Sequence, residues 1–334
     1  MQLLMLAQAL VPLLVTAPDS AVLRLLVDSA RHEVVIEIRL PDAPHHGHHD
    51  AAGAPAESHA AHEQYFVPFA WPVNGWVRGA AVDLIDPAGA TLPQAVLHHI
   101  NLLNLDRRLL LYDGIERLWA GGSESRPVLL PRTVGIPLAA GSRLGVVVAL
   151  SATDRRPGTT VRLRITWTQA TLSPRPVSAY PVGVDVNYRP GLTAAYDLPA
   201  GPSEQSAEFV MPIGGRVLGI GGHLHQYGRA VRLEDAETGR TVFELRPRSD
   251  SAGRILGMPT ALFGIRGRGR PLQAGHRYRI VAVYDNPTGE IIRDGAMGEM
   301  ALLFVPDRPE AWPTLDGTSE GVVREVAVLS GLRR

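Results

Sequence analysis

Short runs in which apolar and polar residues alternate dominate this chain. Residues 33–39 (EVVIEIR) and 160–167 (TVRLRITW) are examples. A period of two places successive side chains on opposite faces of a strand, so each run predicts a half-buried β-strand. Further strands are expected at residues 79–86, 96–104, 143–150, 207–211, 216–221, 230–235, 241–245, 277–284 and 299–305. Helical periodicity is scarce, and the pattern therefore predicts an all-β fold.

The chain is long for a single hydrophobic core. It has 334 residues, and its 34 Gly and 27 Pro fit many turns between short strands. Residues 171–178 (TLSPRPVS) have the composition of a linker and divide the chain near its middle. We therefore expect two tandem jelly-roll-like β-sandwich domains, at residues 18–170 and 183–308, with a linker at 171–182 and a tail at 309–334.

The N-terminus is an apolar run that ends in Val15-Thr16-Ala17, an acceptable cleavage site. The run is too short to cross a bilayer, and no later segment resembles a transmembrane helix. We expect a signal peptide at residues 1–17 and an exported protein, periplasmic or secreted. A buried first strand or helix is the alternative.

Composition narrows the chemistry. The chain has no Cys, and every basic residue is Arg, which excludes thiol nucleophiles, disulfides and lysine Schiff bases. The formal net charge is zero, so a nucleic-acid surface is not indicated. A transition-metal site would have to use His, carboxylate or Met side chains.

The strongest candidate for such a site is His223-Leu224-His225, between two strand-like runs. Residues two apart in a strand point to the same face, about 6.6 Å apart along the chain. Two imidazoles on one face can converge on one ion at about 2 Å each. The alternative is a pair of half-exposed side chains without a ligand. Tyr227, two residues further on, is either a neighbour of the site or an ordinary strand aromatic.

A second candidate is His98-His99, also in a strand-like run. Adjacent residues of a regular strand face opposite sides, so both could bind one ion only where a bulge or twist interrupts the strand. A low-complexity stretch at residues 41–63 contains six further histidines, His45, His46, His48, His49, His59 and His62. This stretch is expected to be a loop, which either captures metal weakly or holds no fixed ion.

Met300, at the start of the last strand-like run, could supply a thioether. Thioether sulfur is a soft ligand that favours Cu(I), and two imidazoles plus one thioether leave a coordination position open. Met297, in a glycine-rich turn, is the rival thioether. In the alternative to both, the methionines only fill the core.

The order of these motifs resembles the copper type II, ascorbate-dependent monooxygenases, the family of peptidylglycine α-hydroxylating monooxygenase and dopamine β-monooxygenase. The resemblance implies two β-sandwich domains with two copper sites. It implies that His98 and His99 belong to an electron-donating copper, and that His223, His225 and Met300 hold the oxygen-binding copper. It extends over roughly residues 70 to 306, but only the histidine and methionine motifs, with Gly228 and Glu299 beside them, are specific.

The chain departs from the family pattern in three respects. The family's third histidine for the donor copper has no counterpart in residues 146–151 (VVVALS), so that copper is either absent or borrows a ligand, for example from the His45–His62 stretch. Gly221 stands where peptide-processing members carry the Arg that reads a substrate carboxylate, which argues against peptide amidation. The family's disulfides cannot form.

Together these observations predict a copper-dependent monooxygenase that hydroxylates a C–H bond of a small organic substrate with O2 and a reductant such as ascorbate. A non-catalytic copper-binding or copper-handling protein that retains the fold is the main alternative. A zinc hydrolase is a third, disfavoured because thioether is a poor ligand for zinc.

Overall fold

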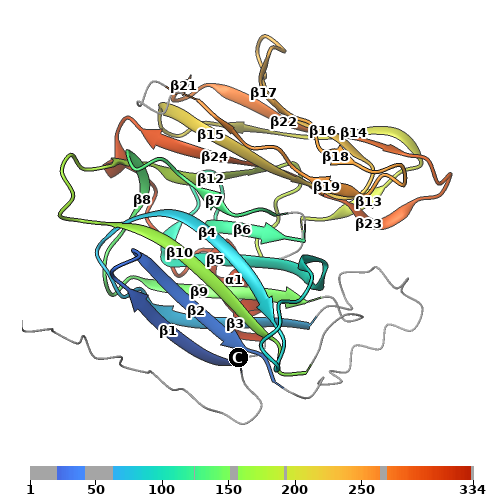
Figure 1. Cartoon of the computed structure of the whole chain (residues 1–334). Coiled ribbons are helices and arrows are strands. Elements are labelled where there is room, and N and C mark those ends of the chain that lie inside the picture. Colours follow the sequence, from blue (N-terminus) through green and yellow to red (C-terminus); the bar gives the residue numbers. More distant parts are fainter. Residues whose placement is uncertain are drawn as a thin grey trace, which may run out of the picture.

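The computed structural model describes residues 21–41, 63–123, 125–150, 157–191, 194–263 and 269–331. The expected signal peptide and the six histidines of residues 45–62 lie outside these ranges. The molecule consists of two β-sandwiches stacked on each other, and this confirms the all-β sandwich fold (Figure 1). In the described residues no helix is long and apolar enough to cross a membrane.

The N-terminal sandwich has two antiparallel layers. One sheet has the order β1-β2-β10-β4-β8-β11, with β7 also paired to β4, and the other has the order β3-β9-β5-β6. The strands are β1 (Val22–Asp28), β2 (Glu33–Arg39), β3 (Glu63–Ala70), β4 (Gly75–Ile85), β5 (Leu97–Arg108), β6 (Ile115–Gly122), β7 (Val128–Leu129), β8 (Val134–Leu138), β9 (Arg143–Leu150), β10 (Thr160–Gln169) and β11 (Val177–Ser178).

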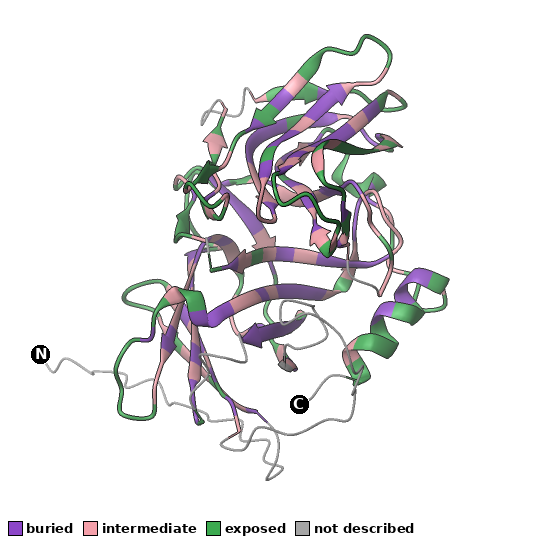
Figure 2. Ribbon diagram, turned by 90° about the vertical axis from the view of Figure 1, so that its right-hand side faces the viewer, coloured by how far each residue is buried: buried purple, intermediate pink, exposed green. Residues whose placement is uncertain are grey.

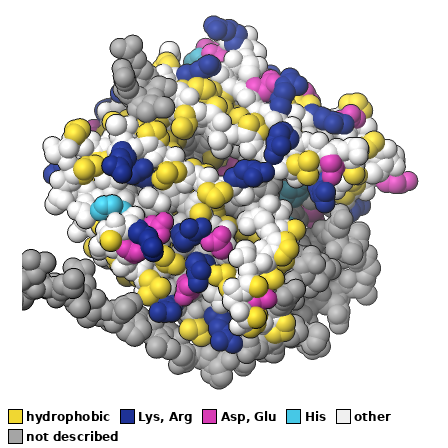
Figure 3. Space-filling view, viewed as in Figure 1, with side chains coloured by type: hydrophobic (Ala, Val, Ile, Leu, Met, Phe, Trp, Pro, Cys, Tyr) yellow, Lys and Arg dark blue, Asp and Glu magenta, His cyan; other side chains and the backbone are white. Residues whose placement is uncertain are grey.

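Alternation along β2 and β10 shows how this sandwich forms. Ile36 lies opposite Leu163 and Ile38 opposite Val161, and all four side chains are fully buried in the core. The intervening positions face outward and carry cross-strand ion pairs, Arg162 with Glu37 at 2.8 Å and Arg164 with Asp83 at 2.9 Å. On the face shown in Figure 3, basic and acidic side chains are interspersed in the same way.

The C-terminal sandwich pairs a sheet of order β12-β24-β15-β20, extended by β21 on β15, with a sheet of order β14-β22-β16-β17. Two two-stranded sheets complete this part of the chain, β13-β23, whose strands are far apart in sequence, and the hairpin β18-β19. The strands are β12 (Tyr180–Asp185), β13 (Tyr196–Leu198), β14 (Gly201–Val210), β15 (Gly215–Leu224), β16 (Gly228–Asp235), β17 (Thr241–Leu245), β18 (Arg248–Ser249), β19 (Ile255–Gly257), β20 (Ala261–Leu262), β21 (Arg270–Leu272), β22 (Arg277–Asn286), β23 (Ile292–Ala296) and β24 (Gly298–Pro306).

Two segments differ from their sequence interpretation. The expected linker at 171–182 contains β11, which pairs in parallel with β8, and the first residues of β12. The expected tail contains a helix, α1 (Glu320–Gly331), at the side of the molecule with most of its residues exposed (Figure 2). Its buried residues are Gly321, Val322 and Glu325, and Leu329 packs against a small core cluster, so the apolar face of this helix is narrow.

A buried carboxylate anchors α1 in addition to its narrow apolar face. Glu325 accepts a hydrogen bond from the Ile115 backbone N–H (2.5 Å) and pairs with Arg117 (2.9 Å), both on β6. Asp113 accepts bonds from Ser319 and from the Gly321 N–H at the first turn of the helix. The C-terminal helix is therefore fastened to the N-terminal sandwich, although it follows the C-terminal one in sequence.

The two sandwiches are also joined around Arg107. Its guanidinium lies 3.8 Å from the ring centre of Tyr180 and 4.2 Å from that of Trp312, and it pairs with the fully buried Glu116 at 3.6 Å. Leu110, from the loop after β5, packs in the core of the other sandwich. These contacts fix the two domains to each other at this point.

We expect Arg107→Ala to lower the free energy of unfolding by about 3–5 kcal/mol, because it leaves Glu116 buried without its cation and removes a cation–π contact. Arg24→Ala is the control, since Arg24 is 61% exposed and pairs with Glu37 at 3.7 Å; it should cost less than about 1 kcal/mol. Denaturant unfolding measures both. Equal effects would contradict the assignment of Arg107 as a domain link.

Candidate metal centre

His223 and His225 stand at the end of β15, on the face of its sheet that points away from the core of the C-terminal sandwich. Leu224 between them is buried in that core, as the alternation of a strand requires. The two ring centres are 5.3 Å apart with an interplanar angle of 86°. Two imidazoles that bind one ion at about 2 Å, at a near-tetrahedral angle, have ring centres about 5 Å apart. The pair therefore has the spacing that a shared ion needs.

A tight turn follows the pair. The Gly228 N–H donates to the His225 carbonyl at 3.1 Å, and Tyr227 within the turn has φ +67°. A Cβ at Gly228 would lie 2.8 Å from the Leu224 Cβ, so this position requires glycine. Tyr227 packs over Gly253, where an added Cβ would lie 2.4 Å from its ring. Tyr227 is therefore a turn residue and does not continue the phase of the strand.

The register between β15 and β24 decides which methionine can join the histidines. His223 lies opposite Glu299 and Gly222 opposite Met300. Met300 is fully buried in the core cluster of the C-terminal sandwich, and a Cβ added at Gly222 would meet the core residue Leu245. Adjacent residues of a strand face opposite sides, so Met300 points into the core while His223 points away from it.

Met297 is the methionine on the histidine side. Leu224 pairs with Gly298, and continuing this register by one residue brings His225 level with Met297. A Cβ at Gly298 would point to Ala282 in the core, so Glu299 faces outward. Met297 lies between β23 and β24, and it is half-buried between the buried residues Ala296 and Gly298, as an outward-facing residue would be. The geometry thus favours Met297, the rival thioether of the sequence interpretation, over Met300.

A hydroxyl group ties Met297 to His225. The Tyr284 hydroxyl on β22 accepts hydrogen bonds from the backbone N–H groups of His225 and Met297, each at 3.0 Å, and donates one to the Met297 carbonyl. The backbones of two candidate ligands therefore meet at one atom. Sequence reasoning missed Tyr284, because nothing in the pattern of β22 distinguishes it from the other buried residues of that strand.

Small residues adjoin His223 on the same face. Gly183, Ala301 and Gly221 are cross-strand neighbours on β12, β24 and β15, two residues along each strand from the row that contains Asp185, Glu299 and His223. A Cβ at Gly221 would approach only Thr260, at 3.7 Å. These three positions therefore place no large side chain over the sheet next to the histidine pair.

Two carboxylates continue the row from His223 towards the N-terminal sandwich. Asp185 is 6% exposed, and its backbone N–H donates to the Tyr112 hydroxyl of the other domain at 2.9 Å. Burial, and after it the nearby Glu299 carboxylate, raises the pKa of Asp185 from 3.8 to about 7, although Arg117 and His223 oppose the shift. Asp185 therefore binds its proton more tightly than an exposed aspartate does.

We expect Asp185→Asn to change how stability depends on pH. Between about pH 4 and 7 the folded protein keeps a proton on Asp185 that the unfolded chain has lost, so the stability linked to this proton is complete below about pH 4 and is lost as the pH rises through about 7. The Asn variant cannot ionise, so it should gain on the order of a few kcal/mol relative to wild type between pH 4 and 8.

Denaturant unfolding across this pH range measures the effect. Asp285→Asn, at an exposed ion pair with Arg229, is the control and should show no such trend. A constant difference between the Asp185 variant and the wild type at all pH values would contradict the raised pKa.

A β-bulge interrupts the strand at the His98-His99 pair, which is the condition under which two adjacent histidines can bind one ion. The pairing of β5 with β9 shifts between Leu97 and His99, so His98 is the additional residue of a β-bulge. Leu97 and Ile100 on either side are both fully buried in the core, which puts both histidines on the opposite face. Their ring centres are 5.0 Å apart, again close to the spacing for a shared ion.

No third ligand accompanies this pair in the described residues. The cross-strand neighbours of His99 are Ala149 on β9 and Gly122 on β6, neither of which has a donor side chain. Across the described parts of the chain, no three His, Asp or Glu side chains are grouped so that they could hold a metal ion. A three-ligand site among these residues therefore needs a different donor, and only the C-terminal pair has a thioether beside it.

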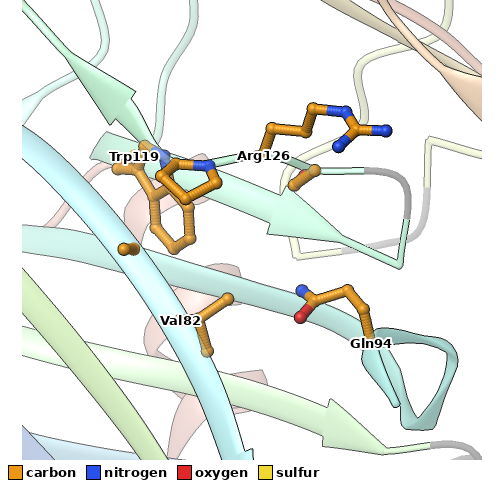
Figure 4. Close-up of a pocket in the computed structure, with 7 residues that line it drawn as sticks. Val82, Gln94, Trp119 and Arg126 are labelled. Atoms are coloured by element: carbon orange, nitrogen blue, oxygen red, sulfur yellow. The ribbon is translucent and has the colours of Figure 1, made fainter.

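A small hollow lies beside this region but does not contain the histidines. Val82, Gln94, Trp119 and Arg126 line it between β4 and β6, together with Ala81, Ser125 and Pro127 (Figure 4). The Gln94 amide donates to the carbonyl of Gly122, the partner of His99, at 3.4 Å. None of the described residues that line the hollow is acidic or a histidine.

No family model matches the chain, and no curated protein matches it. Among solved structures, the Sulfolobus Turreted Icosahedral Virus structure is similar, with 12% identity, 80% of this chain and 94% of that chain covered, and a TM-score of 0.37. PNGase F, a glycosylasparaginase from Flavobacterium meningosepticum, is similar with 11% identity, 80% and 96% coverage, and a TM-score of 0.38. Broad Bean Stain Virus is similar with 11% identity, 90% and 92% coverage, and a TM-score of 0.32. At these values the similarities support no inference about function.

Proposed function

We propose that the C-terminal sandwich binds one copper ion through His223, His225 and Met297, and that the protein is a copper-dependent monooxygenase of a small organic substrate. One observation carries this proposal: the ring centres of His223 and His225 are 5.3 Å apart, and the Tyr284 hydroxyl joins the backbones of His225 and Met297. Two nitrogens and a soft sulfur suit Cu(I) better than Zn or Mg, which supports copper and disfavours the zinc hydrolase.

The residues around the pair fit such a group. When bound with an open coordination position, copper supplies the means to activate O2 for hydroxylation of a C–H bond, with electrons from a reductant such as ascorbate. The chain's own part is to hold the two rings at 5.3 Å and to keep the row Gly183, Ala301 and Gly221 free of large side chains. A substrate lying on that row would be next to His223.

The row of small residues beside His223 also indicates the class of substrate. Gly221 has no side chain, and its neighbours Ala301 and Gly183 offer no charge, so these three positions supply no cation to bind a substrate carboxylate. The acidic side chains of Asp185 and Glu299 lie in the adjacent row. We therefore propose a substrate without a carboxylate near the reacting carbon.

A second function, copper binding without turnover, is favoured by the N-terminal pair. His98 and His99 have the spacing for an ion but only Ala149 and Gly122 across from His99. A site with two ligands is underfilled and binds copper weakly. A protein that lacks a firmly held second copper must receive every electron from an external reductant, or it only carries copper.

The two methionines provide the sharpest test of the site. We expect Met297→Leu to weaken Cu(I) binding by more than the roughly 10–100-fold that loss of an outer-shell partner costs. Met300→Leu is the matched control, because it exchanges one core side chain for another of similar volume and should leave the affinity unchanged. Competition with a Cu(I) chelator measures both. The reverse result, with Met300→Leu as the damaging change, would overturn the assignment of Met297.

Copper stoichiometry and O2 uptake separate the two functions. We expect one firmly bound copper per chain, unchanged by His98→Ala with His99→Ala and lost with His223→Ala, by elemental analysis of copper-loaded protein. Substrate-dependent O2 uptake in the presence of ascorbate supports the monooxygenase. Firm copper binding without uptake, over a panel of small uncharged and basic substrates, would favour the copper-binding protein.

A further inference from the structure

Tyr284 occupies an unusual place in the C-terminal sandwich. It belongs to β22, in the sheet opposite the one that carries His223 and His225. The residue is 1% exposed, and its side chain lies among the buried residues of the core. Its hydroxyl nevertheless ends at the far sheet, where β15 stops and β24 starts, because it bonds to His225 and Met297 there.

The three hydrogen bonds use the full capacity of this hydroxyl. A tyrosine hydroxyl has one proton to donate and can accept through its lone pairs. The proton goes to the Met297 carbonyl, and the lone pairs accept the N–H groups of His225 and Met297, each at 3.0 Å. The relative position of these two backbones therefore depends on one oxygen atom, since the paired register of β15 and β24 ends at Leu224 and Gly298.

The ring that carries this hydroxyl is itself held in place. Tyr196 packs against it edge to face, with ring centres 6.4 Å apart. Tyr284 lies opposite Gly228 in the β16–β22 pair, and the next residue, Asp285, donates its N–H to the Tyr227 carbonyl at 3.1 Å. The turn after the histidines and the methionine before β24 are thus both fastened to the same end of β22.

We propose that Tyr284 is a positioning residue, which sets the distance between His225 and Met297 and so presents the imidazole and the thioether to one ion. The effect on metal binding rests on the proposed function, whereas the positioning of the two backbones does not. Groups that orient metal ligands without touching the metal typically change affinity by about 10–100-fold when removed.

Tyr284→Phe tests the proposal, with Tyr278→Phe as the matched control. Tyr278 lies on the same strand and is 4% exposed, and its hydroxyl accepts the Gln273 N–H at 3.0 Å, at the other end of β22. Each variant loses one buried tyrosine hydroxyl that accepts a hydrogen bond from a backbone N–H. Only Tyr284→Phe removes the link between His225 and Met297.

Two readouts are needed. In the absence of metal, hydrogen exchange of the His225 and Met297 amides should become faster in Tyr284→Phe and stay unchanged in Tyr278→Phe, because only the first loses its acceptor. With copper, Tyr284→Phe should bind Cu(I) about 10–100-fold more weakly and change the EPR spectrum of the Cu(II) form, while Tyr278→Phe does neither. Unchanged exchange at both amides, or unchanged affinity and spectrum in a wild type that binds copper, would overturn the proposal.

Failure of the proposed copper function and failure of the proposed role of Tyr284 give different results. A wild-type protein that binds no copper refutes the proposed function, and the exchange comparison then decides the role of Tyr284 alone. If Tyr284→Phe does not fold, the wild-type protein provides the test through the tyrosine hydroxyl proton. A slowly exchanging hydroxyl proton with nuclear Overhauser contacts to both amide protons supports the proposal, and its absence overturns it.

Discussion

The candidate site depends on one register, that of β15 against β24. A shift by one residue in a strand pair moves every side chain to the other face of the sheet. In the observed register His223 faces outward with Glu299, and Met300 faces the core with Gly222. The same alternation that builds the hydrophobic core therefore keeps Met300 away from the side of His223, and it leaves Gly221 and Ala301 beside His223 without large side chains.

A β-bulge, rather than regular strand alternation, places the N-terminal histidine pair on one face. A single bulge residue at His98 keeps Leu97 and Ile100 in the core and turns two consecutive imidazoles outward. The two pairs thus have similar ring spacings, 5.0 and 5.3 Å. They differ in their described surroundings, because the Tyr284 hydroxyl joins the backbone of His225 to that of a methionine, Met297. This asymmetry is the physical basis for proposing one firm copper site and for keeping a copper-binding protein as the alternative.

The alternation of apolar and polar residues predicted part of the strands. The bounds of β2, β9 and β17 are those expected from the sequence, whereas β1, β6, β8 and β12 were not predicted. The alternation also placed His223 and His225 on one face. The choice between Met297 and Met300 was not accessible, because cross-strand register is a tertiary property. Tyr284 was missed because its hydroxyl acts across the sandwich. The helix α1 was missed because its apolar face is narrow and a buried charged residue, Glu325, lies on it.

The most direct measurement is the location of copper in crystals of the Cu(I)-loaded protein, by anomalous diffraction at the copper absorption edge. We expect an anomalous peak on the outward face of β15, at the position of a copper ion bonded to ring nitrogens of His223 and His225 and to the sulfur of Met297. A peak that is bonded to Met300, or that lies away from His223 and His225, would contradict this expectation.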